Sequence, residues 1–170
     1  PLQVELASAW DGWSRPGRVT EVELRVQSQD HVSAGLAITA GGQVVHSTVQ
    51  LAPGEQVRLV VPVPATERIT AAVAPAGTNQ QQREIALSLA EAPLLAWVAP
   101  AAPAQSTAGF HVIAFDASAL PENAAAYSSI DALVIDRALV GTITERQLAA
   151  LLSFMASCGR TVLISGTPAA

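Results

Sequence analysis

Residues 130–166 constrain the fold of this chain more than any other segment, because they place one helix between two buried strands. Residues 132–135 form a nearly unbroken apolar run, which is typical of a strand covered on both faces of a parallel sheet. A helical pattern follows, and residues 161–165 form a second apolar run. Strands joined in this way make a right-handed strand–helix–strand unit. The segment therefore predicts a doubly wound α/β domain.

The helix in this segment carries its own start and stop signals. Thr144 and Gln147 form a capping box, in which each side chain can bond the other residue's backbone amide. Gly159 is expected to end the helix in a left-handed conformation. Apolar residues at helical spacing predict the face that packs on the sheet: Leu148, Leu151, Leu152 and Met155.

The first half of the chain has a different period. Residues 19–28 alternate apolar and polar side chains, which is typical of a strand with one buried face and one wet face. Similar alternation recurs up to about residue 90, and Gly41-Gly42 fits a two-residue hairpin turn. About seven short strands predict an antiparallel β-sandwich of immunoglobulin type over residues 1–91. The paired cysteines of antibody domains are missing, so the prediction concerns the architecture alone.

Residues 92–170 are then predicted to form a partial, flavodoxin-like α/β domain. Its first two strands are expected at 94–99 and 110–115, with at most a short helix within 104–108, because prolines interrupt that segment. A further short helix is expected from Pro121 to about residue 128. About four parallel strands leave the last one with an unpaired edge or an uncovered face. We expect downstream polypeptide of a parent chain, or a second copy, to pair there.

Composition excludes several function classes. The net charge of −5, with nine arginines and no lysine, argues against nucleic acid as a partner. No apolar run reaches the roughly 20 residues that a membrane-spanning helix needs. A phosphate loop and zinc-type spacing of His31, His46 and His111 are both missing, so no cofactor and no metal are predicted. The first residue is Pro1, which indicates a chain trimmed or cut from a longer one.

Cys158, the one cysteine, is predicted to be structural rather than catalytic. It follows the apolar side of the helix near its carboxyl end, where the helix dipole disfavours a thiolate. The sequence also lacks the Gly-x-Cys-x-Gly or Gly-x-Ser-x-Gly turn that exposes a nucleophile. These features predict that the chain is not an enzyme by itself.

Two other groups of residues are candidates for binding. Asp116, Asp136 and Ser165 end successive predicted strands, at the edge of an α/β sheet where ligands usually bind. We favour a role for both aspartates in capping loop amides, and take this rim as the first place to look for a ligand. Trp10 and Trp13 flank a turn and could stack on sugars, although covering the end of the core is favoured.

Several motifs resemble bacterial envelope proteins of poorly defined function, in which an immunoglobulin-like sandwich precedes a domain similar to class I glutamine amidotransferases. The matching segments are residues 11–18, 51–54, 120–122, 127–136, 144–148 and 159–166. The resemblance implies an exported, extracytoplasmic parent protein, periplasmic or membrane-anchored and facing outward. It supports the fold more than any activity, because the motifs are structural.

Together these observations predict a non-catalytic scaffold or interaction module of a larger exported protein. Its partner would be another protein, the rest of the parent chain, or a second copy bound at the open sheet edge. One alternative is an amidotransferase- or hydrolase-like enzyme completed by downstream residues. Another is a carbohydrate-binding module that uses Trp10 and Trp13.

Overall fold

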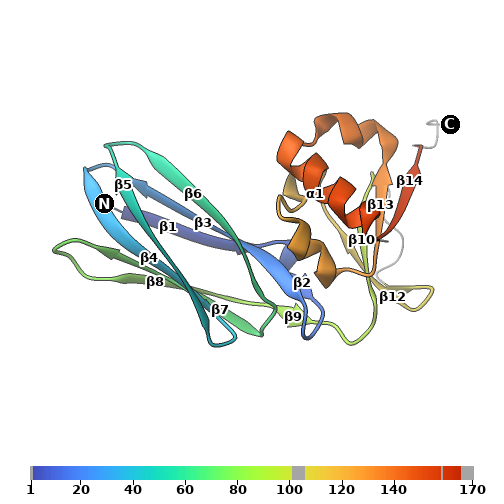
Figure 1. Ribbon diagram of the computed structural model, residues 1–170, viewed down its shortest axis with the longest axis horizontal. Coiled ribbons are helices and arrows are strands. Elements are labelled where there is room, and N and C mark those ends of the chain that lie inside the picture. Colours follow the sequence, from blue (N-terminus) through green and yellow to red (C-terminus); the bar gives the residue numbers. More distant parts are fainter. Residues whose placement is uncertain (1, 101–105, 158, 166–170) are drawn as a thin grey trace.

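A computed structural model describes residues 2–100, 106–157 and 159–165, which form a β-sandwich followed by an α/β part (Figure 1). The sandwich has a three-stranded and a four-stranded sheet, and all neighbouring strands in them are antiparallel. The first sheet has the order β1 (Leu2–Ser8), β3 (Val19–Ser28), β6 (Gln56–Pro64), and the second β5 (Gln43–Leu51), β4 (Val32–Ala40), β7 (Arg68–Pro75), β8 (Gln81–Ala86). The predicted antiparallel sandwich is therefore confirmed.

The core of the sandwich lies between its two sheets and follows the period of two in the strands. Leu24, Ile38 and Ile69 are among its fully buried side chains. Gly41 and Gly42 both have positive φ between β4 and β5, as the predicted hairpin turn requires. Each strand thus contributes alternate side chains to one shared apolar layer.

A short parallel pair links the sandwich to the rest of the chain. It consists of β2 (Trp13–Ser14) and β9 (Ser88–Leu89), and the strand that follows it belongs to the α/β part. Near β2, a short 3-10 segment, η1 (Trp10–Gly12), turns the chain between β1 and β2. The sandwich therefore contacts the α/β part through segments at both ends of its own sequence.

The described residues of the α/β part form one five-stranded sheet, whose last four strands in spatial order are parallel. The order is β11 (Ser106–Thr107), β12 (Phe110–Ala114), β10 (Leu94–Val98), β13 (Ala132–Asp136), β14 (Arg160–Ile164). The short helix expected within 104–108 is wrong at residues 106–107, which pair with β12 as an antiparallel strand. Residues 101–105 lie outside the described residues. The prolines already weakened the helical pattern there.

Within the described residues, three 3-10 helices and one α-helix connect these strands. They are η2 (Ala117–Ala119), η3 (Ala124–Ser129), η4 (Arg137–Thr142) and α1 (Glu145–Ala156). The helix expected from Pro121 begins only at Ala124, because the Asn123 side chain caps the segment by accepting the Ala125 amide at 3.1 Å. None of the helices in the described ranges is long and apolar enough to cross a membrane.

The predicted capping box of α1 is confirmed. The Thr144 hydroxyl accepts the Gln147 amide at 3.2 Å, and the Gln147 side chain accepts the Thr144 amide at 2.9 Å. The predicted packing face is only half right, because Leu151 is buried whereas Leu152 and Met155 are 54% and 41% exposed. The buried side is rotated toward Gln147 and Ala150.

Gly159 follows α1 for a different reason from the predicted one. It is not among the glycines with positive φ, so the left-handed ending is wrong. Its amide donates to the Phe154 carbonyl at 2.9 Å, and a Cβ at this position would lie 2.5 Å from the Phe154 ring. A larger residue here would force the Phe154 ring to shift, so glycine lets the chain pass directly against that ring.

Candidate ligand pocket at the junction of the two parts

Trp10 joins the two parts by leaving the sandwich and entering the core of the α/β part. Its side chain is 1% exposed, and its indole N–H donates to the Ala126 carbonyl at 2.9 Å. Its ring packs edge-on against Phe115 and Tyr127, with centroids 5.4 and 5.1 Å away. Trp10 therefore has no free face for a sugar, and the sugar-stacking interpretation is wrong for it.

Trp13 lies beside this core and is half-buried. Its ring centroid is 3.9 Å from that of His111, at the start of β12. Among the described residues, no three His, Cys, Asp or Glu side chains gather closely enough to hold a metal ion. His111 thus serves as a packing partner of the second tryptophan.

A buried line of hydroxyls continues the junction. The hydroxyls of Ser14 and Ser129 are 2.5 Å apart, and Ser129 donates to the Val19 carbonyl at 2.6 Å. Ser128 accepts the Val19 amide at 3.0 Å. Since Ser14 and Ser129 have no exposed surface, these bonds replace water that both parts would otherwise bind.

Glu21 holds the loop before η3 against the sandwich. It lies on β3, is 7% exposed, and accepts the amides of Glu122 and Asn123 at 3.3 and 2.7 Å. Burial raises the pKa of its carboxyl, and the two amide bonds oppose that rise. Arg58 extends the contact at the surface by pairing with Glu122 at 2.9 Å and with Glu23.

The raised pKa of Glu21 predicts how the junction responds to pH. Because the folded chain binds this proton more tightly than the unfolded chain does, Glu21 stabilises the fold most below pH 4.5. That stabilisation is lost as the pH rises through the folded-state pKa. We expect the unfolding free energy of the wild type, relative to Glu21→Gln, to fall between pH 4.5 and pH 7. Urea denaturation across that range measures it, and a difference independent of pH contradicts it.

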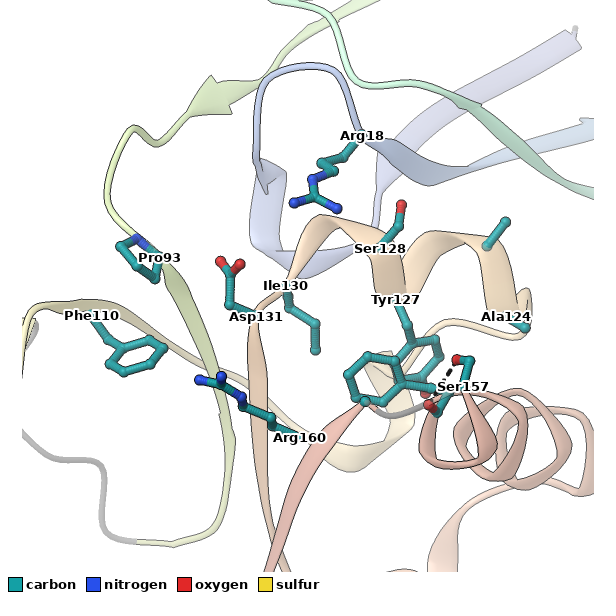
Figure 2. Close-up of a pocket in the computed structure, with 13 residues that line it drawn as sticks. Arg18, Pro93, Phe110, Ala124, Tyr127, Ser128, Ile130, Asp131, Ser157 and Arg160 are labelled. Atoms are coloured by element: carbon teal, nitrogen blue, oxygen red, sulfur yellow. Dashed lines mark hydrogen bonds between the residues drawn. The ribbon is translucent and has the colours of Figure 1, made fainter.

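A pocket of about 520 Å³ opens beside this junction, at the amino-terminal end of the parallel strands (Figure 2). Three charged side chains line it: Arg18 before β3, Asp131 before β13, and Arg160 at the start of β14. Asp131 accepts the Leu94 amide at 2.8 Å and lies 3.8 Å from the Arg15 Nε. The aspartate therefore already has partners, whereas the two arginines of the wall face the open space.

The rim predicted from the sequence lies at the opposite edge of the sheet. Asp136 is buried and accepts the Ala138 amide at 2.9 Å, so its predicted capping role is confirmed. Asp116 precedes η2 but makes no capping bond with its side chain, so that interpretation is wrong for Asp116. Its exposed carboxylate borders a second pocket of about 510 Å³. Ser165 is exposed after β14, and Cys158 lies outside the described residues.

The edge of the sheet at β14 is open in the described part of the chain. β14 pairs with β13 on one side, and the sheet order places it last. Val162 and Leu163 are 53% and 55% exposed. Figure 1 shows this strand at the outer side of the α/β part. The predicted uncovered strand is therefore present.

In comparisons with known proteins, the chain is similar to several solved structures, with low TM-scores. No family model and no curated protein matches the chain. A CARDB domain from Pyrococcus furiosus, solved with di-metal ions, is 21% identical over 53% of this chain and 94% of its own, with a TM-score of 0.40. A Paenibacillus glucanotransferase is 18% identical over 78% of this chain and 20% of its own, with a TM-score of 0.38.

Proposed function

We propose that this chain is a non-catalytic interaction module of a larger exported protein. In this proposal the sandwich and the α/β part act as one body, and the open edge at β14 takes up a further polypeptide strand. The observation that carries it is the exposure of Val162 and Leu163 on a strand with one free side among the described residues. Apolar side chains on an edge strand favour pairing with another strand.

The finer fold assignment belongs to the same proposal. The parallel strands β10, β12, β13 and β14, numbered in chain order, have the spatial order 2-1-3-4. Flavodoxin-like sheets have the order 2-1-3-4-5, so a fifth strand would lie beside β14. We therefore infer an immunoglobulin-like sandwich joined to a flavodoxin-like, amidotransferase-related domain, as the sequence motifs suggested. The added strand and its helix would cover Leu152 and Met155 as well.

The enzyme alternative rests on Asp116 and Ser165, the two predicted rim residues that are exposed. The Asp116 carboxylate is exposed beside the second pocket, whereas Asp136 is committed to a backbone amide. A nucleophile from further polypeptide would have to join Asp116 at that edge. The carbohydrate alternative loses its paired platform, because Trp10 is buried.

A charge placed on the open edge tests the proposed strand addition. In the isolated chain, we expect β14 to pair with β14 of a second copy, which gives self-association that increases with concentration. Leu163→Lys should weaken it at least about tenfold, because a buried leucine contributes about 1.5–3 kcal/mol. The matched control is Val44→Lys, since Val44 is 48% exposed on β5 of the sandwich. Sedimentation velocity over a concentration series measures both.

Two results would contradict the proposed strand addition. If the chain stays monomeric at every concentration and the β14 amides exchange as slowly as those of β13, the edge is already protected. If Leu163→Lys and Val44→Lys weaken self-association equally, β14 is not the site of contact between the copies.

A further inference from the structure

We propose that the junction pocket binds a small oxyanion, a carboxylate or a phosphate, carried on an aromatic or apolar body. The site lies at the opposite end of the sheet from the rim of Asp116, and it shares only Arg160 with the open edge strand β14. It combines two arginines from different parts of the chain with an aromatic wall, in a volume of about 520 Å³. Pockets of about 300–1,000 Å³ are the usual size for small-molecule sites.

The charges of the pocket favour an anion. Arg15 and Asp131 lie 3.8 Å apart and offset each other. Arg18 and Arg160 have no ion-pair partner among the described residues, in a chain with a net charge of −5. Five other arginines do approach a carboxylate: Arg15, Arg25, Arg58, Arg68 and Arg146. Two arginines without an ion-pair partner among the described residues therefore line the same pocket.

The two arginines come from different elements that border one pocket. Arg18 enters from the loop before β3, and Arg160 enters from the first residue of β14. Figure 2 shows the Asp131 side chain between those of Arg18 and Arg160 in this view. A guanidinium offers parallel N–H donors that match the oxygens of a carboxylate or phosphate. An anion bound there would lie between Arg18 of the sandwich and Arg160 of the α/β sheet.

The remaining wall suits the body of the ligand. Phe110, Tyr127 and Phe154 line the pocket, and the rings of Tyr127 and Phe154 are stacked with centroids 5.2 Å apart. Burial raises the pKa of Tyr127, so its phenol stays protonated and adds no competing charge. The Ser157 hydroxyl already donates to the Phe154 carbonyl at 2.9 Å. Recognition of charge therefore falls to the two arginines.

A titration with matched probes tests the proposal on the whole chain. Phenyl phosphate and benzoate are added separately while amide and arginine N–H signals are followed by NMR, and benzyl alcohol serves as the neutral probe. We expect saturable shifts around Arg160 and Phe110 with the two anions, and the tighter one identifies phosphate or carboxylate. Arg18→Gln and Arg160→Gln should each weaken binding about tenfold. Arg137→Gln, an exposed arginine on η4, should leave it unchanged.

Other outcomes would overturn the assignment. Absence of saturable shifts with either anion up to about 10 mM, more than enough to load a site with a Kd near 1 mM, would remove the site. If benzyl alcohol binds as tightly as the anions, the charge of the ligand plays no part in binding. If Arg137→Gln weakens anion binding as much as the two pocket variants do, the effect comes from the net charge of the chain and not from the pocket. If inorganic phosphate binds as tightly as phenyl phosphate, the aromatic side chains of the pocket do not contribute to binding.

Discussion

Replacing Trp10 with alanine is expected to lower the unfolding free energy by about 4 kcal/mol, the usual cost of removing a buried tryptophan. The indole is 1% exposed, contacts Phe115 and Tyr127, and donates to the Ala126 carbonyl. Trp10 also has a φ of 55°, a left-handed conformation that costs a non-glycine residue about 1–3 kcal/mol. Burial of the ring outweighs that cost.

Urea denaturation of Trp10→Ala beside Trp13→Ala measures this effect. Trp13 is only half-buried, so its removal should cost about 1–2 kcal/mol, in proportion to the smaller area it covers. Trp10→Phe keeps an aromatic ring but loses the hydrogen bond to Ala126. Its loss of unfolding free energy should lie between those of Trp10→Ala and Trp13→Ala. If Trp10→Ala proves no more destabilising than Trp13→Ala, the tryptophan does not hold the two parts together.

The second large effect is expected for Gln147→Glu, a change that alters charge and donors with almost no change in shape. The Gln147 side chain is 4% exposed, and its amide nitrogen donates to the carbonyls of Ser118 and Leu120 at 3.0 and 2.8 Å. A carboxylate there would face two acceptors, which should cost about 3 kcal/mol of unfolding free energy at pH 7.

The capping box supplies the matched control. Thr144→Ala removes the hydroxyl that caps α1 but leaves the bonds of Gln147 to Ser118 and Leu120, so it should cost about 1 kcal/mol. Thermal or urea unfolding of both variants separates the roles. At acidic pH the loss in Gln147→Glu should shrink, because a protonated carboxyl can donate again. If Gln147 acted only as the capping-box partner, Gln147→Glu would cost almost nothing at pH 7, because a glutamate oxygen can also accept the Thr144 amide.

Local sequence signals predicted where the helices and strands lie better than they predicted which side of each element is buried. The Thr144 and Gln147 pair predicted the start of α1 because both bonds join residues three apart. The direction of the helix face was missed, since Leu152 and Met155 have helical spacing but remain exposed. Nothing in the period of the helix tells which leucines the adjacent sheet covers and which ones an open edge leaves bare.

The junction and its pocket were not predicted, because they depend on contacts between distant residues. Trp10 and Ala126 are 116 positions apart, and Glu21 and Asn123 are 102 positions apart. The alternation of β3 placed Glu21 on a wet face, and packing of η3 against that face buries it. The pocket with Arg160 likewise forms at the amino-terminal edge, where the sandwich packs, and not at the rim that the fold class favoured.

The claim that the two parts act as one body can be tested directly by residual dipolar couplings of the 170-residue chain in a weakly aligning medium. Amides of the sandwich and amides of the α/β sheet should fit one alignment tensor with the same magnitude and orientation. Two tensors of different magnitude would mean that the parts move independently, and would contradict the rigid junction built by Trp10 and Glu21.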